Sequence, residues 1–151
     1  YNDISNLTGI EAFTALTELF CHTNQLTSLD VSQNTALSGL NCSDNPLSSL
    51  NVSGATALTY LVCGANDLTS LDVSQNTALT DLNCGWNQLT SLNVSQNTAL
   101  NYLDCGNNQL TSLNLSQNTV LYGLGCQGNK FDCVDINEEE GFEEEDYYEE
   151  D

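Results

Sequence analysis

Positive charge is almost absent from this sequence of 151 residues. Lys130 is the only lysine or arginine, whereas 21 residues are acidic, so the formal net charge is −20. Binding to a nucleic acid or to an anionic membrane surface depends on clustered basic side chains. The composition therefore excludes both as specific partners. No apolar run is long enough to insert into a bilayer either.

Groups that commonly carry catalysis are also scarce. His22 is the only histidine, and no serine, cysteine or carboxylate has a spacing that would pair with it as a nucleophile or base. No Cys-x-x-Cys pair is present, which argues against zinc, and the glycines form no phosphate-binding loop. The sequence predicts that the protein is not an enzyme and that it needs no organic cofactor.

What the sequence does contain is a repeat of constant length. Six cysteines stand 21 residues apart, and an asparagine follows each of them at a constant distance. The cysteines are Cys21, Cys42, Cys63, Cys84, Cys105 and Cys126; the asparagines are Asn24, Asn45, Asn66, Asn87, Asn108 and Asn129. Self-similarity at a fixed period of this size is typical of a solenoid.

Each unit has two halves with nearly the same pattern. The first reads Leu-x-x-Leu-x-Cys-x-x-Asn, from Leu79 to Asn87, and the second reads Leu-x-x-Leu-x-Val-x-x-Asn, from Leu89 to Asn97. Apolar residues two apart share one face of an extended segment, and a single coil cannot bury that face alone. We therefore expect stacked coils about 4.8 Å apart, with asparagine side chains bonding the backbone where the chain turns.

The pattern Leu-x-x-Leu-x-Cys-x-x-Asn-x-Leu resembles the leucine-rich repeat, with cysteine in the third apolar position. The 21-residue unit with its second Leu-x-x-Leu-Asp-Val half is similar to the short nested repeats of bacterial secreted and cell-surface proteins, including internalin-like adhesion modules. The resemblance covers roughly residues 4–136. It implies a right-handed leucine-rich repeat solenoid of about six coils, with a parallel sheet on the concave face and extended or turn backbone on the convex side. It also implies a secreted or cell-surface location.

The chain divides into four parts by this pattern. Residues 1–15 are expected to form an N-terminal capping coil, and residues 16–120 hold five 21-residue repeats. Residues 121–136 are expected to form a partial repeat and C-terminal cap, and residues 137–151 are an acidic tail rich in glutamate and tyrosine.

The six repeated cysteines are expected to be buried, reduced and inert. In-register Cβ atoms about 4.8 Å apart with parallel vectors do not suit a disulfide. Cys133 lies outside this series and could pair with Cys126 near the end of the stack.

Ligand-binding residues are predicted where the outward positions of the Leu-x-Cys strands vary between coils. These positions mix aromatic side chains with carboxylates and amides, as protein and glycan sites do. In leucine-rich repeat proteins the corresponding concave sheet is the usual binding face. The alternative is that these positions vary neutrally on a solvated surface. The predicted site consists of Phe20, Tyr60, Asp81, Asn83, Trp86, Tyr102 and Asp104.

The second half of each unit is monotonous by comparison. It carries the columns Thr27, Ser48, Thr69, Thr90, Thr111 and Asp30, Asn51, Asp72, Asn93, Asn114, and the column Ser32, Ser53, Ser74, Ser95, Ser116. We expect these hydroxyls and amides to bond the turn backbone. The alternatives are a flat surface for lateral packing or, less simply, for binding ice.

The acidic tail allows three interpretations. It could be solvated and disordered. It could bind Ca²⁺, which prefers oxygen ligands, through Glu138, Glu139, Glu140, Glu143, Glu144, Glu145 and Asp146. It could also dock on another copy or another protein through Phe142, Tyr147 and Tyr148.

These observations favour a non-catalytic extracellular recognition or adhesion module that binds a protein or a glycan on the concave face. The alternative is a structural subunit of a homo-oligomer or filament. Such a subunit would pack through the ends of the stack, the monotonous face and the acidic tail, with Ca²⁺ as a further requirement.

Overall fold

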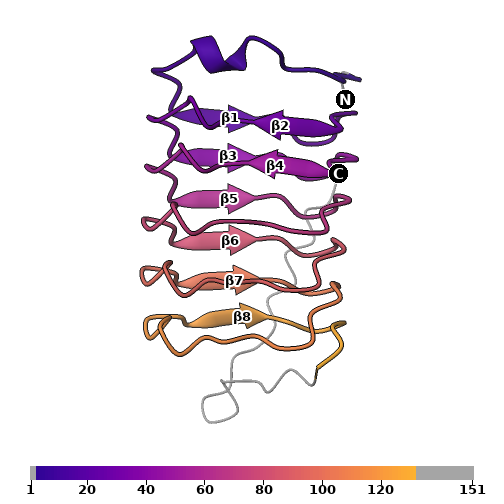
Figure 1. The fold of residues 1–151 in the computed structure, drawn as a ribbon, viewed down its shortest axis with the longest axis vertical. Helices are drawn as coiled ribbons and strands as arrows, with labels where there is room; N and C mark the ends of the chain where they lie inside the picture. The colour runs from indigo at the N-terminus through magenta and orange to yellow at the C-terminus, as the bar shows by residue number, and fades with distance from the viewer. Residues whose placement is uncertain (1–2, 132–151) are drawn as a thin grey trace, which may run out of the picture.

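The computed structural model describes residues 3–131, which form a stack of parallel coils (Figure 1). One strand from each of six coils contributes to a six-stranded parallel sheet in the order β1-β3-β5-β6-β7-β8. The strands are β1 (Glu18–Phe20), β3 (Gly39–Asn41), β5 (Tyr60–Val62), β6 (Asp81–Asn83), β7 (Tyr102–Asp104) and β8 (Gly123–Gly125). Every strand pairs in register with a residue 21 positions away, as Leu82 does with Leu103, so the repeat length sets the pairing.

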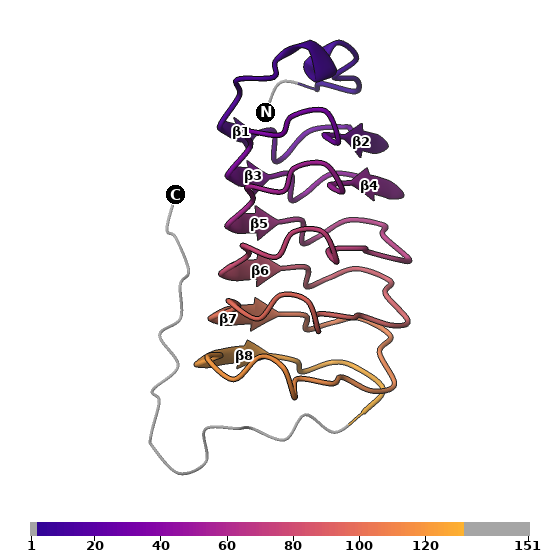
Figure 2. The same cartoon turned by 60° about the vertical axis from the view of Figure 1, so that its left-hand side comes forward.

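The opposite side of the coils is mostly turns and extended backbone. Among residues 3–131 only β2 (Ser28–Asp30) and β4 (Ser49–Asn51) pair there, as a two-stranded parallel sheet. Figure 2 shows these two strands across the coil from the six-stranded stack. The fold is the expected leucine-rich repeat solenoid with its main parallel sheet on one side.

The N-terminal coil departs from the repeat. It contains the short 3₁₀ helix η1 (Ile10–Ala12), and Ile4 and Leu7 pack against the core, whereas Phe13 is exposed. At the other end Phe131 packs against the core in place of the usual leucine. Nowhere between residues 3 and 131 does a helix have the length and apolar character of a membrane span.

The core consists of stacked columns of leucine, valine and cysteine. The strand leucines Leu40, Leu61, Leu82 and Leu103 are fully buried, and the columns at the coil corners are equally closed to solvent. Full burial of one such side chain contributes about 2 kcal/mol relative to exposure. Each coil obtains this only from its neighbours, because its leucines all point into the shared interior.

A column of asparagines closes the corner after each Leu-x-Cys strand. In the central coil, Asn87 donates from Nδ2 to the carbonyls of Cys63, Cys84 and Gly85 and accepts at Oδ1 from the Leu68 N–H. The Oδ1 contact recurs with the preceding coil from Asn24 through Asn129. One side chain therefore satisfies backbone groups of two coils, which confirms the predicted corner role.

A second asparagine column is only half satisfied. Asn97 donates from Nδ2 to the carbonyls of Val73 and Asn76 in the preceding coil. Its Oδ1, like that of Asn34, Asn76 and Asn118, is buried without a hydrogen-bond partner. Both carbonyls also accept a backbone N–H within their own turn, Val73 from Asn76 and Asn76 from Leu79. The second column thus adds to bonds that already exist, whereas the first column supplies bonds that the backbone lacks.

One coil replaces this second asparagine with Ala55 and the preceding glutamine with Gly54. A Cβ on Gly54 would lie 1.7 Å from the Ser32 carbonyl oxygen of the preceding coil, so the two turns touch through their backbones at this point. Ala55 shows that the second asparagine position tolerates loss of its amide.

The two asparagine columns predict different costs of truncation. Asn87→Ala leaves the buried Leu68 N–H without an acceptor and is expected to lower the free energy of unfolding by about 3 kcal/mol. Asn97→Ala removes only additional donors and is expected to cost about 1 kcal/mol. Urea unfolding of the two variants checks this order; equal costs, or a larger cost for Asn97→Ala, would contradict the assignment.

Candidate functional site

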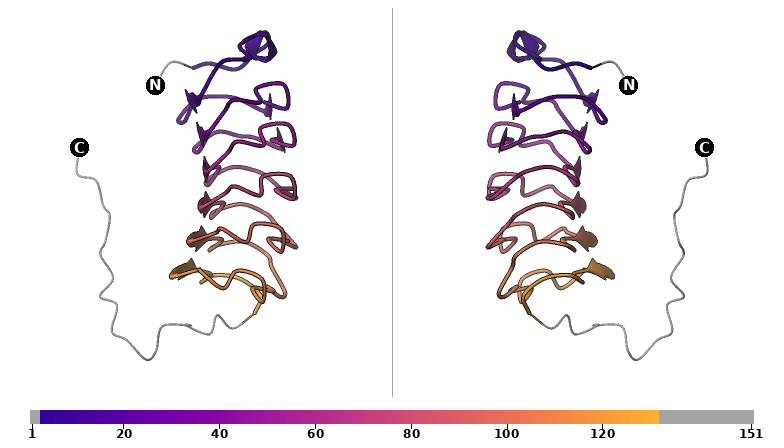
Figure 3. Two further views of the ribbon diagram at one scale, coloured as in Figure 1. Left: turned by 90° about the vertical axis from the view of Figure 1, so that its left-hand side faces the viewer. Right: turned by 90° about the vertical axis from the view of Figure 1, so that its right-hand side faces the viewer.

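The candidate site lies on the solvent side of the six-stranded sheet. Figure 3 shows that its strands follow a shallow arc with the sheet on the inner side, which we call the concave face. Two residues of each strand point outward, one on either side of a central leucine, which is buried in the four inner strands and partly buried in β1 and β8. The first outward column is Glu18, Gly39, Tyr60, Asp81, Tyr102 and Gly123; the second is Phe20, Asn41, Val62, Asn83, Asp104 and Gly125.

The structure brings three predicted site residues into one row. Tyr60 pairs with Asp81 and Asp81 pairs with Tyr102 on consecutive strands β5, β6 and β7. The two tyrosine side chains are 42% and 40% exposed, so part of each is open to a ligand. Asp81 accepts at Oδ2 from the Thr80 hydroxyl at 2.7 Å, which holds its carboxylate in place.

Two other predicted residues also serve their own turns. Asn83 Oδ1 accepts from the Gly85 N–H at 3.1 Å, and Asp104 Oδ1 accepts from the Gly106 N–H at 2.9 Å. Asn41 makes the same contact with Ser43 two coils earlier. An amide or carboxylate in this column is therefore explained by local structure, although the remaining atoms stay accessible at the surface.

Trp86 lies beside the sheet rather than on it. It occupies the turn after β6, is 68% exposed and has a φ of 54°. Left-handed backbone is unusual for a bulky residue, but here the coil imposes it. Positive φ recurs at the same position in every coil, at Thr23, Asp44, Ala65, Asn107 and Gly128.

Phe20 stands apart from the row at the N-terminal end of the face. It is the last residue of β1 and is 60% exposed. The seven predicted residues thus share one side of the stack, but only Tyr60, Asp81, Asn83, Tyr102 and Asp104 lie on adjacent strands.

Sequence reasoning missed Tyr122, which precedes β8 and is 59% exposed. It ends a column whose other members are Thr17, Ser38, Thr59, Thr80 and Asn101. The signal was available, because Tyr122 is the single aromatic in a column of hydroxyl and amide residues. Its position next to the outer strand extends the aromatic surface toward the C-terminal coil.

The surroundings of Tyr102 show how closely this face is packed. The ring lies against Gly123 of the next strand, where an added Cβ would come within 2.5 Å of Tyr102 Cδ2. Burial, and secondly the negative charge of Asp104, raise the pKa of the Tyr102 hydroxyl. The phenol therefore stays neutral and can donate a hydrogen bond to a ligand.

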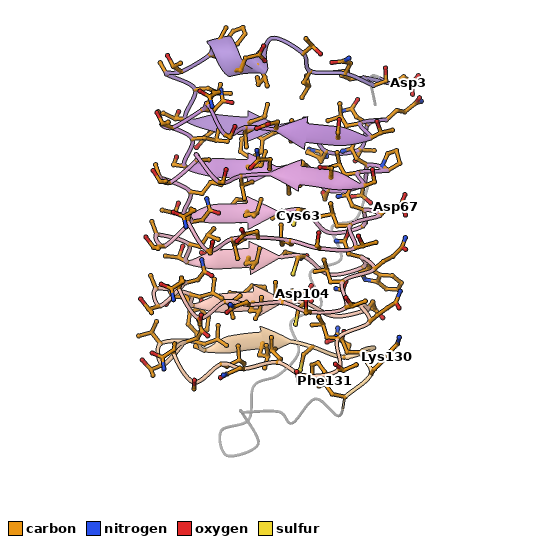
Figure 4. All side chains as sticks on the ribbon, in the orientation of Figure 1. Asp3, Cys63, Asp67, Asp104, Lys130 and Phe131 are labelled. Atoms are coloured by element: carbon orange, nitrogen blue, oxygen red, sulfur yellow. The ribbon has the colours of Figure 1, made fainter. Side chains whose placement is uncertain are left out.

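Negative charge on the concave face has no local counter-charge in the described chain. Its two outward columns carry Glu18, Asp81 and Asp104 and no basic residue. Lys130 bonds Gln109 Oε1 instead, at the coil corners. Figure 4 shows Lys130 at the edge that also carries Asp3 and Asp67, away from Asp104.

The monotonous half of each unit has the structural role that we expected. Asp30, Asn51, Asp72, Asn93 and Asn114 each accept the backbone N–H of the serine two residues later. These bonds lower the pKa of Asp72 and Asp30, because the Ser74 and Ser32 N–H groups stabilise the ionised carboxylates. We call this surface the uniform face.

The predicted tail ligands and docking residues, from Glu138 to Tyr148, lie outside the described residues. Within residues 3–131 no group of three histidine, cysteine or acidic side chains could hold a metal ion. Calcium binding by the tail remains a prediction.

The cysteine column is buried along the inside of the sheet. Cys21, Cys42, Cys63, Cys84 and Cys105 are free thiols, as expected. Burial raises the pKa of Cys21 to about 11 and that of Cys105 to about 12, and raises those of the three between them further above the usual range. Such thiols carry little thiolate at neutral pH and are poor nucleophiles.

Cys126 corrects the expectation that all six are reduced, since it is disulfide-bonded. It is 2% exposed and lies in the last coil that residues 3–131 describe. Cys133, the partner that the sequence suggested, lies outside the described residues.

Neither a family model nor a curated protein sequence matches the chain. Solved structures do. The internalin InlF of Listeria monocytogenes is similar at a TM-score of 0.81, with 27% identity over 84% of this chain and 39% of that one. A leucine-rich repeat protein of Leptospira interrogans is similar at a TM-score of 0.76, with 27% identity over 83% of this chain and 34% of that one.

The functional domain of InlJ from Listeria monocytogenes, described as including a cysteine ladder, is 38% identical over 89% of this chain and 40% of that one, at a TM-score of 0.52. The chain thus spans 34–40% of the length of these three structures. The three are bacterial, and the two internalins and the Leptospira protein share the repeat fold seen here.

The buried thiols predict a loss of stability at high pH. Their folded pKa values lie above the unfolded value of about 8.5, so the unfolded chain loses protons first. The stabilisation is complete below that pH and declines as pH rises toward 11, by up to about 1.4 kcal/mol per thiol per pH unit. Guanidinium unfolding at neutral pH and near pH 10 measures the change.

Thiol labelling provides the control for that prediction. A maleimide reagent at neutral pH should leave the five free cysteines unmodified in the folded chain and modify them after unfolding. Rapid labelling of the folded chain at Cys63 or Cys84 would contradict burial as the cause.

Proposed function

We propose that this leucine-rich repeat chain is a non-catalytic recognition or adhesion module that binds a protein or glycan ligand on its concave face. One observation carries the proposal. Of the seven exposed large hydrophobic side chains in residues 3–131, five lie on or beside this face, and the second halves of the repeats carry one, Val120. The five are Phe20, Tyr60, Trp86, Tyr102 and Tyr122.

Exposed aromatic rings suit recognition because they bring large contact area with little loss of side-chain entropy. The sheet beneath them is rigid, since each strand is paired on one or both sides and every leucine between the outward residues is buried or partly buried. A ligand would therefore meet rings that already hold their positions, which lowers the cost of binding.

The solved structures support the same role and a location at the cell surface or in the secreted fraction. Two of the similar proteins are internalins, and one of them is described by its functional domain. We carry the interaction role over as a proposal, because this chain covers less than half of either protein.

A structural subunit is the less supported alternative. The acidic and amide groups of the uniform face are used within their own turns, and the tail that would add a contact lies outside the described residues. Light scattering of the full chain with Ca²⁺ and with a chelator tests this alternative, since calcium-dependent assembly would favour it.

Trp86→Gly offers a sharp test of the concave face. Glycine adopts positive φ without the strain that a side chain causes, and Gly128 already occupies the same position in a later coil, so the change should preserve or raise stability by about 0.5 kcal/mol. A ligand found by screening the labelled chain on arrays of glycans and extracellular protein domains should bind the variant about tenfold more weakly. Combining Trp86→Gly with Tyr60→Ser should weaken binding further.

Gln96→Gly is the matched control, because it also places glycine on a solvent-exposed turn where another coil has one, Gly54. It lies away from the concave face and should change binding less than about twofold. Equal binding by Trp86→Gly, Tyr60→Ser and the unmodified chain would refute the proposal, as would a loss confined to Gln96→Gly.

A further inference from the structure

We propose that the row Tyr60–Asp81–Tyr102 is a seat for a cationic side chain, so the partner presents an arginine-bearing protein segment to the concave face. This inference rests on the proposed function and names the chemistry of its partner. Three features of the row support it: its negative charge, the spacing of its strands and an Asp81 oxygen that accepts no hydrogen bond within residues 3–131.

The charge of the face favours a cation. Glu18, Asp81 and Asp104 are its ionisable outward carboxylates, and no basic residue stands in either outward column. Asp81 and Asp104 lie on neighbouring strands, two positions apart along the strand. The spacing between strands and the rise per residue place them about 8 Å from each other. Two carboxylates so placed repel each other, and a positive group between them removes that repulsion.

The strand spacing leaves room for one planar cation above Asp81. Tyr60 and Tyr102 stand two strands apart, roughly 10 Å, with Asp81 midway. A cation above Asp81 is about 5 Å from each neighbouring strand. Cation–π attraction requires about 6 Å from the ring centroid. The Tyr102 ring leans away from Asp81, onto Gly123 of β8, so this attraction is expected from Tyr60. Arginine suits this position better than lysine because its flat guanidinium stacks on rings while bonding a carboxylate.

Asp81 has an oxygen available for that bond. Oδ2 accepts from the Thr80 hydroxyl, and Oδ1 has no partner among residues 3–131. The Thr59 carbonyl of the preceding coil lies 3.0 Å from the same Thr80 hydroxyl and is a second acceptor for its single proton. The same row does not suit a bare metal ion, because the described chain nowhere gathers three metal-ligating side chains.

The test follows the ¹⁵N spectrum of the full chain at about 0.15 M salt, where charges more than ~8 Å apart are screened. The probe is the peptide acetyl-Gly-Arg-Gly-Arg-Gly-amide, and the matched peptide carries glutamate in place of arginine. The arginine peptide should shift the amide signals of Tyr60, Asp81 and Tyr102 in a saturable manner. The glutamate peptide should leave them unchanged.

Variants that replace a carboxylate with an amide distinguish binding at this row from nonspecific attraction of the peptide to the acidic chain. The double variant Asp81→Asn with Asp104→Asn should lower the affinity for the arginine peptide about tenfold. Asparagine at position 104 should keep the turn contact, because Asn83 makes the same contact in its own coil. Asp72→Asn is the control, since Asn93 occupies the same position, and should change affinity less than about twofold. Tyr60→Phe should retain binding and Tyr60→Leu should weaken it, because only the former keeps the ring.

The proposal is overturned if the arginine peptide shifts only signals beyond Ile136, or shifts none. Equal loss in Asp72→Asn, or equal shifts with the glutamate peptide, overturns it as well. Suppose that ligand binding is lost with Trp86→Gly and Tyr60→Ser but is unaffected by Asp81→Asn with Asp104→Asn. That result would support recognition by the concave face and refute the cationic partner.

Discussion

The structure depends on how each coil satisfies its backbone where it turns. At the corner after each strand the Asn24–Asn129 column does this with one amide per coil, accepting an N–H of the preceding coil and donating to carbonyls on both. That geometry works only if successive coils are identical in length, because the amide must meet the same backbone groups each time. The constant period, the in-register sheet and the stacked leucines and cysteines all follow from it.

Much of this architecture was predictable from sequence. The period determines which residues stack, and the alternation around Cys84 determines which point inward, so the solenoid, its sheet and the corner role of asparagine were all correctly expected. Backbone conformations that the path of the coil imposes at its turns were less predictable. The left-handed turn at Trp86 follows from coil geometry, and its sequence column, from Thr23 to Gly128, shows no common residue type.

The candidate site was predictable only as a surface. Variation between coils predicts a binding surface at the outward positions, and Tyr122 lies in a neighbouring column just before β8. That variation could not show that Asn83 and Asp104 hold their own turns, since turn contacts and ligand contacts use the same side-chain oxygens. The grouping of Tyr60, Asp81 and Tyr102 depends on strand order and register. The buried positions of the repeat therefore form the shared scaffold, and these three outward positions are free to vary with the partner.

The Gly54–Ala55 coil shows what a near-identical repeat permits. It lacks the second asparagine, yet its neighbours stack on both sides with unchanged register. Each coil presents the same acceptors and donors to the next. If a 21-residue unit is added or deleted, the coils on either side can therefore still stack through the same hydrogen bonds. Recombination between such units can therefore change the reach of the concave face in single-strand steps of about 4.8 Å. Aromatic and acidic rows are then brought together or apart by gene rearrangement, without a new fold having to evolve.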